Sequence, residues 1–186
     1  VSRLVSGEAD IGMLPANVVA QLYNRDVPVQ IAAITLWGVL YVVSSDREIE
    51  TWGDLADRTV YSLSPGSTPD VLFRHILDQN GVDPESDVSI DYRYGHVELA
   101  HAVAAGLVDT AVLPEPFVTS VTQRNSDVRV ALDFQAESRR MYGSSYPQTA
   151  VVVRRDVAET APDAVEDALR LIEISLNDAL SDPEET

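Results

Sequence analysis

The sequence has 186 residues, is 45% hydrophobic and carries a formal net charge of -17 at pH 7. This length allows one domain or two small lobes. The acidic charge argues against nucleic acid and anionic membrane surfaces as partners, because their phosphates would repel the protein. No apolar run approaches the length of a membrane span, and the absence of cysteine excludes disulfides, thiol catalysis and cysteine metal sites.

The basic residues are all arginine, and lysine is absent. One interpretation is a salt-adapted surface, because high salt screens the self-repulsion of so acidic a protein. The other is a genome that encodes arginine in place of lysine. The composition leaves both interpretations open.

The first residues resemble the end of a helix, and a strand follows over residues 9–14. A strand with almost nothing before it is a poor first element of an α/β lobe. We therefore expect one or more βα units to precede this sequence in the full protein, together with any signal peptide.

Residues 15–24 are predicted to form a helix, and residues 29–35 a buried strand. The pattern breaks at Trp37-Gly38, and a strand resumes over residues 39–44. We interpret this stretch as a crossing between two lobes, with Gly38 relieving the backbone at the bend. Trp37 is either a core residue or part of a ligand cleft.

A polar loop separates a predicted strand over residues 59–63 from a predicted helix over residues 71–80. The loop reads Ser-Pro-Gly-Ser-Thr, and backbone N–H groups and hydroxyls converge at such a helix N-terminus, where the dipole favours anions. It is neither a Walker loop nor a dinucleotide fingerprint. Its hydroxyl residues are ligand contacts or plain helix caps.

The chain is organised around residues 102–118, which predict a helix ending at Gly106, a short buried strand and a second helix. The same pattern stands 99 residues earlier, where Gly7, Asp10, Leu14 and Pro15 match Gly106, Asp109, Leu113 and Pro114. Chance similarity or two related α/β lobes would produce this match. In the second case both Leu-Pro corners lie at carboxyl ends of strands, where ligands bind.

Glu115 follows the second corner and is predicted to lie in the first turn of the next helix. Its carboxylate either interacts with the helix dipole or accepts hydrogen bonds from a ligand. Residues 128–134 are predicted to form a strand, and residues 135–147 an irregular return crossing. A strand over 148–154 rejoins the first lobe, a long helix spans 162–180, and the acidic residues 181–186 form a mobile tail.

These pieces together resemble the substrate-binding proteins of ABC transporters in the nitrate, sulfonate, taurine and pyrimidine-precursor group. The matching segments, between Leu4 and about Leu180, are SGEADIGMLPANVVAQLYN, TLWGVLYVVSSD, SPGSTPD and AGLVDTAVLPEPFV. The resemblance implies a two-lobe α/β fold of the periplasmic-binding-protein type II class, with mostly parallel sheets and a ligand cleft between the lobes. Residues 1–42 and 148–186 would form an incomplete first lobe, lacking its opening βα units, and residues 43–147 the second lobe.

The resemblance also implies a set of ligand-binding positions from both lobes. They are Pro15, Ala16, Asn17, Trp37, Gly38, Ser64, Gly66, Ser67, Thr68 and Glu115. None of them is basic, which disfavours nitrate. A ligand with both polar acceptors and N–H donors, such as a pyrimidine precursor or an amino-sulfonate, fits better. Nothing in the sequence places Arg93 or Arg139 at the cleft.

The function implied is that of the extracytoplasmic solute-binding component of an ABC importer, which captures a small polar organic solute by lobe closure. Its partners would be the ligand and a membrane permease, with a lipid anchor outside this sequence as the only membrane contact. No catalytic residue, cofactor or metal is expected, and His96 and His101 are interpreted as solvated or capping residues. The alternatives are an enzyme of pyrimidine or menaquinone-precursor synthesis and a cytosolic effector-sensing domain.

Overall fold

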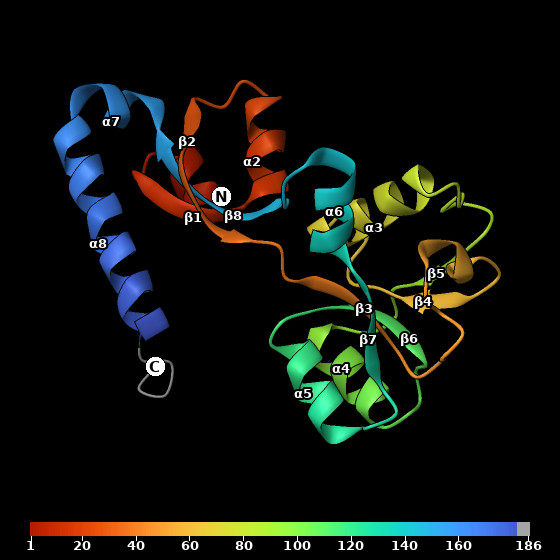
Figure 1. Cartoon of the computed structure of the whole chain (residues 1–186). Coiled ribbons are helices and arrows are strands. Elements are labelled where there is room, and N and C mark those ends of the chain that lie inside the picture. The colour runs from red at the N-terminus through yellow and green to blue at the C-terminus, as the bar shows by residue number, and fades with distance from the viewer. Residues whose placement is uncertain (182–186) are drawn as a thin grey trace. The chain divides into compact units, whose positions relative to one another are not determined.

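The chain divides into two units, each with its own sheet (Figure 1). The computed structural model describes residues 1–181, so most of the predicted tail lies outside the described residues. Unit 1 comprises residues 1–37 and 147–186, and unit 2 comprises residues 38–146. The sequence predicted divisions after residues 42 and 147. The first division comes earlier because the strand β3 (Leu40–Ser44) pairs only with strands of unit 2.

Unit 1 is built on an antiparallel three-stranded sheet. Its elements are α1 (Ser2–Val5), β1 (Ile11–Pro15), α2 (Ala16–Tyr23), β2 (Val29–Trp37), β8 (Pro147–Arg154), α7 (Arg155–Thr160) and α8 (Pro162–Ser181). β8 lies between β1 and β2 and is antiparallel to both. The prediction that the strand near residues 148–154 rejoins the first part of the chain is therefore confirmed.

Unit 2 is built on a mixed five-stranded sheet in the order β5-β4-β6-β3-β7. Besides β3, its elements are a short 3-10 helix (Trp52–Leu55), β4 (Thr59–Tyr61), α3 (Thr68–Gln79), β5 (Ser89–Asp91), α4 (His96–Ala104), β6 (Thr110–Pro114), α5 (Phe117–Arg124), β7 (Arg129–Asp133) and α6 (Phe134–Tyr142). β4 is parallel to β5 and β6, whereas β3 is antiparallel to β6 and β7.

The two units share one arrangement of strands. In unit 1, β1 and β2 flank β8, and in unit 2, β6 and β7 flank β3. α2 connects β1 to β2 in unit 1, and α5 connects β6 to β7 in unit 2. In both units the strand between the outer two comes from a distant part of the sequence. Gly7 and Gly106, which precede β1 and β6, have φ values of +80° and +71°, which glycine adopts without strain. The predicted internal repeat is therefore structural.

Apolar side chains cover both faces of the unit 2 sheet. Val42 of β3 packs with Phe73 of α3 on one face, whereas the next residue, Val43, packs with Leu99 of α4 on the other. Both valines are 0% exposed. Successive side chains of a strand point to opposite faces, so a strand that is covered on both faces is apolar at every position. The unbroken apolar run in β6 predicted this arrangement. This core fixes the ends of β4, β5 and β6.

Two predictions about the fold are wrong. The sheets are not mostly parallel, because the strands β8 and β3, which enter from distant segments, run opposite to their neighbours. Residues 135–147 are not irregular, because most of them form α6. The Asp133 side chain caps α6 by accepting from the N–H groups of Gln135 and Ala136. The polar composition of α6 concealed its buried face, which includes Phe134 and Glu137.

Candidate functional site

Three helices of unit 2 begin at the same edge of its sheet. β4, β5 and β6 are parallel, and each is followed by a helix, α3, α4 or α5. The carboxyl ends of these strands and the N-termini of these helices therefore share one edge (Figure 1). Exposed N–H groups and the helix dipole give each N-terminus a partial positive charge. Each N-terminus also has a carboxylate of the protein beside it, because Asp70, Glu98 and Glu115 accept from the N–H groups of Gly66, Gly95 and Thr119, respectively.

The β4–α3 loop (residues 64–68) lies at this edge. Ser64 and Gly66 have φ values of +31° and +75°, a region that strains the serine. The Ser67 hydroxyl donates to the Leu63 carbonyl at 2.8 Å, and no cap hydrogen bond from Ser67 to α3 occurs within the described residues. Ser67 is therefore not a plain helix cap. Its oxygen lone pairs remain able to accept hydrogen bonds.

The carboxylate of Asp70 holds this loop from inside α3. It accepts hydrogen bonds from the Gly66 N–H at 2.6 Å, from Arg74 Nε at 2.8 Å and from the Tyr92 hydroxyl at 2.5 Å. Burial opposes ionisation of Asp70, but these hydrogen bonds outweigh burial and hold its pKa below the ordinary value. Burial and the bond to Asp70 raise the pKa of Tyr92 to about 12.

Glu115 lies in the turn before α5, and not in its first helical turn as predicted, because α5 begins at Phe117. Its Oε2 accepts hydrogen bonds from the N–H and the hydroxyl of Thr119, at 3.1 and 3.0 Å. The expected interaction with the helix N-terminus is therefore present. The Glu115 N–H donates to the Val39 carbonyl, 2.9 Å away. The side chain is exposed, and its predicted contact with a ligand stays a prediction.

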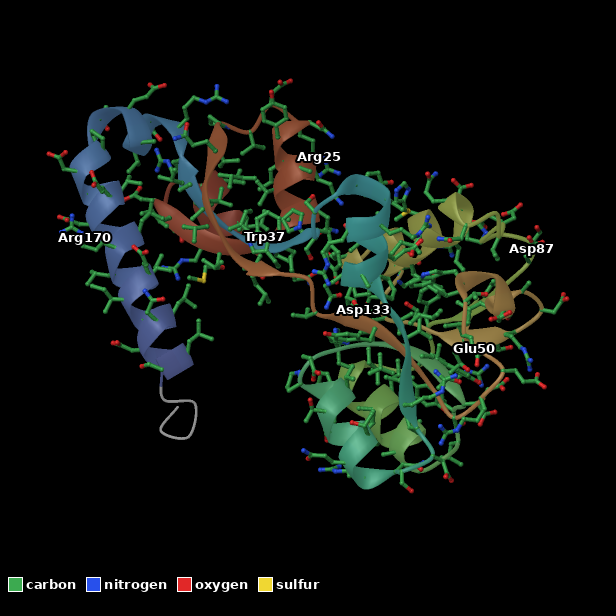
Figure 2. All side chains as sticks on the ribbon, in the orientation of Figure 1. Arg25, Trp37, Glu50, Asp87, Asp133 and Arg170 are labelled. Carbon is green, nitrogen blue, oxygen red and sulfur yellow. The ribbon has the colours of Figure 1, made fainter. Side chains whose placement is uncertain are left out.

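Trp37 and Gly38 lie where the chain first passes from unit 1 to unit 2. Gly38 is buried with a φ of +51°, and a Cβ added there would lie 2.1 Å from Gln135 Cγ. The predicted role of Gly38 in relieving the bend is confirmed. Trp37 ends β2 with 53% of its surface exposed (Figure 2), so it is not a core residue. Ligand contact stays a prediction for both residues.

The remaining predicted ligand residues belong to unit 1. Pro15 ends β1 opposite Thr149 of β8, and Ala16 and Asn17 begin α2. Trp37 ends β2 opposite Pro147 of β8. The structure therefore brings the unit 1 residues to one end of the unit 1 sheet, as it brings the β4–α3 loop and Glu115 to one edge in unit 2.

The sequence offered no signal for three further residues. Three buried side-chain atoms have no hydrogen-bond partner in the described part of the chain, namely Ser62 Oγ, Ser145 Oγ and Gln148 Oε1. Ser62 directly follows β4, Ser145 Oγ is 3.0 Å from a Cβ built on Gly38, and Gln148 lies in β8. Buried polar atoms without a partner are uncommon. Their closeness to predicted ligand residues makes them candidates for contact with ligand or water.

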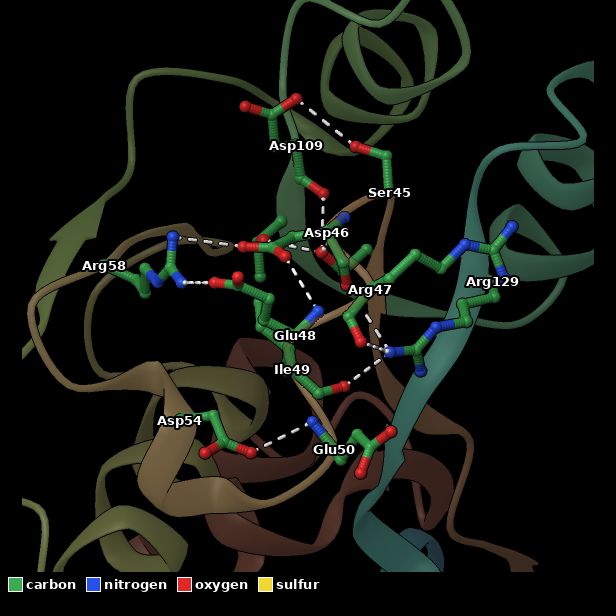
Figure 3. Close-up of polar contacts among 12 residues, drawn as sticks. Ser45, Asp46, Arg47, Glu48, Ile49, Glu50, Asp54, Arg58, Asp109 and Arg129 are labelled. Atoms are coloured by element: carbon green, nitrogen blue, oxygen red, sulfur yellow. Dashed lines mark hydrogen bonds and ion pairs between the residues drawn. The ribbon is translucent and has the colours of Figure 1, made fainter.

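A second polar region lies at the amino ends of β4 and β6, where a cavity of about 550 Å³ is lined by residues such as Thr59 and Thr110. Several of its polar side chains contact one another, and the Ser45 hydroxyl donates to Asp109 (Figure 3). Arg58 bridges Asp46 and Glu48 at 3.1 and 2.9 Å. This region lies at the edge of the sheet opposite the helix N-termini.

The structure also places the side chains of Arg93, Arg139 and His96, each in a different part of unit 2. Arg93 donates to Asp91, and its guanidinium lies 5.8 Å from the centre of the Tyr61 ring. Arg139 is exposed on α6, and His96 begins α4 with its ring 6.3 Å from that of Phe117. Within residues 1–181, no group of three or more histidine or acidic side chains could hold a metal ion. No helix in that range is both long and apolar enough to cross a membrane.

The chain matches the family described as ABC transporter, phosphonate, periplasmic substrate-binding protein over residues 1–179. A search of curated proteins finds no match. Among solved structures, an ABC transporter from Parabacteroides distasonis is 30% identical, with a TM-score of 0.75, and the alignment covers 99% of this chain and 60% of that chain.

Two more distant structures share the fold. The periplasmic aliphatic sulphonate binding protein SsuA from Escherichia coli is 17% identical, with a TM-score of 0.81 and coverage of 99% of this chain and 60% of that chain. A binding protein component of an ABC phosphonate transporter from Pseudomonas aeruginosa is 18% identical, with a TM-score of 0.59 and coverage of 89% and 57%. The predicted fold class is confirmed, except for the strand directions. The chain spans about 60% of the length of the first two of these proteins.

Proposed function

The chain belongs to the periplasmic substrate-binding protein family of phosphonate ABC transporters, and from this membership we propose that it is the solute-binding component of an importer. Its partners are then a small-molecule ligand and a membrane permease, and its location is extracytoplasmic. The protein binds its solute without chemical change. Capture by closure of the two lobes stays a prediction. The family and the neighbouring structures give no support to the enzyme or effector-sensing alternatives.

The observation that carries the proposal is the edge of unit 2 where α3, α4 and α5 begin. Backbone N–H groups at helix N-termini bind phosphonate and sulfonate oxygens without a basic side chain. None of the predicted ligand positions is basic, so the N–H groups at the helix N-termini are the donors that we expect a sulfonate or phosphonate to use. Two proteins that share the fold, an aliphatic sulphonate binding protein and a binding component of a phosphonate transporter, agree with this ligand chemistry.

The acceptors at the same edge favour a ligand that also carries N–H groups. Ser67 Oγ has donated its hydrogen to Leu63, and Glu115 is an exposed carboxylate. Both can accept from an ammonium or amide group, which a plain alkanesulfonate lacks. We therefore expect amino-sulfonates and aminophosphonates to bind more tightly than the corresponding unsubstituted anions.

Thermal melting and calorimetry of the purified protein test this function. The panel holds taurine, ethanesulfonate, 2-aminoethylphosphonate, ethylphosphonate, nitrate, bicarbonate, a pyrimidine precursor and riboflavin. A ligand of the folded state at about 100 times its Kd adds about 2.7 kcal/mol to stability, which raises the melting temperature by several degrees. We expect taurine or 2-aminoethylphosphonate to give the largest shift.

Two substitutions separate the anion contact from the amine contact. Ser67→Ala is expected to weaken both an amine-bearing ligand and its plain analogue, because the hydroxyl supports the loop that contains the N–H groups, and to weaken the amine-bearing ligand more, because Oγ is also an acceptor for the amine. Glu115→Gln is expected to weaken the amine-bearing ligand by about tenfold and the plain analogue much less. Ser175→Ala and Glu159→Gln, both exposed in unit 1, are the matched controls. The absence of any shift across the whole panel would contradict the proposed function.

A further inference from the structure

We propose that Asp70 is a positioning residue that holds the β4–α3 loop in its ligand-binding conformation and ties this loop to the segment after β5. The inference rests on the proposed function, because it concerns the same edge of unit 2. Asp70 itself is 5% exposed and does not reach the surface of the site. Its effect on a ligand is therefore exerted through the loop.

Two hydrogen bonds within the loop hold its ends, from the Ser67 N–H to the Ser64 carbonyl at 3.0 Å and from the Ser67 hydroxyl to the Leu63 carbonyl at 2.8 Å. Ser64, Pro65 and Gly66 are exposed, and the φ of +31° at Ser64 is a conformation that a residue other than glycine adopts only when its surroundings require it. The Gly66 N–H donates to Asp70 Oδ2 at 2.6 Å. This charge-assisted hydrogen bond fixes the middle of the loop, since a bond to a carboxylate is about twice as strong as one between neutral groups.

The carboxylate is itself held in one orientation. Its other oxygen, Oδ1, accepts from Arg74 Nε at 2.8 Å and from the Tyr92 hydroxyl at 2.5 Å. Arg74 Nη2 also donates to the Tyr92 oxygen at 2.9 Å, which closes a triangle of three side chains. Arg74 belongs to α3, and Tyr92 directly follows β5. One buried carboxylate thus joins the two loops that precede α3 and α4.

An amide at position 70 cannot replace this carboxylate. Three donors converge on the two oxygens, whereas asparagine offers one oxygen and an NH2 group that would face a donor. Asp70→Asn has nearly the same shape, so it removes the charge and one acceptor without leaving a cavity. Asp78→Asn on the exposed side of the same helix is the matched control. Tyr92→Phe removes one of the three donors and leaves the Gly66 bond in place.

The first experiment needs no ligand. Amide hydrogen exchange by NMR is measured for Gly66, with Val42 in the core of β3 as the reference for global unfolding. We expect Asp70→Asn to accelerate exchange at Gly66 about tenfold or more while Val42 stays protected, because a lost hydrogen bond opens the loop locally. Asp78→Asn should match the wild type. Unchanged exchange at Gly66, or equal acceleration at Val42, would overturn the proposal.

The second experiment measures the Kd of taurine and of ethanesulfonate by calorimetry. We expect Asp70→Asn to raise the Kd of a bound probe about tenfold and Tyr92→Phe to raise it less, since the loop keeps its hydrogen bond. Wild-type affinity in Asp70→Asn, despite faster exchange at Gly66, would also overturn the proposal. If the wild-type protein binds neither probe, the proposed ligand class fails, and the exchange experiment alone decides the role of Asp70.

Discussion

The phenol oxygen of Tyr146 accepts hydrogen bonds from the backbone N–H groups of Leu40 and Val39, at 3.0 and 3.1 Å. Tyr146 is the last residue of unit 2, and Leu40 begins its first strand. The Gly38 N–H also donates to the Tyr146 carbonyl at 3.1 Å. The two segments that connect unit 2 to unit 1 are therefore bound to each other at the point where they leave it.

Tyr146→Phe should destabilise unit 2 by about 1 to 3 kcal/mol, because it leaves the N–H groups of Leu40 and Val39 without their acceptor. Urea unfolding followed by circular dichroism measures the change. Tyr23→Phe, at a side chain that is 67% exposed in unit 1, is the matched control and should change stability little. Equal stability of the two variants would contradict the structural role of the Tyr146 hydroxyl.

Stability should fall as the pH rises between 10 and 12. Burial raises the pKa of Tyr146 from 10.0 to about 12, and burial together with Asp70 does the same for Tyr92. In this interval the unfolded chain has lost these protons while the folded protein keeps them, so alkali favours unfolding. Their contribution is complete below pH 10. The slope of unfolding free energy against pH should be shallower in Tyr146→Phe than in the wild type, and identical slopes would refute the assignment.

Gly38→Ala should destabilise the protein by about 2 kcal/mol or more, because the methyl group meets Gln135 and the left-handed backbone strains alanine. The added Cβ would lie 2.1 Å from Gln135 Cγ. Gly53→Ala is the control, because a Cβ there has only an ordinary contact of 3.6 Å. Adding Gln135→Ala should restore part of the lost stability by removing the clash but not the strain. No recovery in the double variant would show that the backbone alone sets the cost.

The melting temperature should rise between low salt and molar KCl if the surface is salt-adapted, because salt screens the repulsion within a chain of net charge -17. Replacing exposed carboxylates of α8, with Glu166→Gln, Asp167→Asn and Glu173→Gln together, should reduce this rise. If the melting temperature of the wild type does not change with salt, the salt-adapted surface is contradicted. The absence of lysine is then explained by a genome that encodes arginine in its place.

The sequence by itself determined most of the element order and the places where ligand residues could stand. Gly7 and Gly106, the Leu-Pro corners and the Ser-Pro-Gly-Ser-Thr loop are local signals, because backbone conformation at glycine and proline depends on a few neighbouring residues. The internal repeat was predictable for the same reason. α6 was missed because its polar residues hide the face buried by Phe134.

Only the tertiary structure decided which distant segments meet. Leu40 and Tyr146 are 106 residues apart, and Asp70 and Tyr92 are 22 residues apart. β8 entering between β1 and β2, and β3 between β6 and β7, reversed the predicted strand directions. Such pairings leave no periodic trace in the sequence, because they depend on how whole elements pack. The buried carboxylate behind the β4–α3 loop was therefore visible only once the chain was folded.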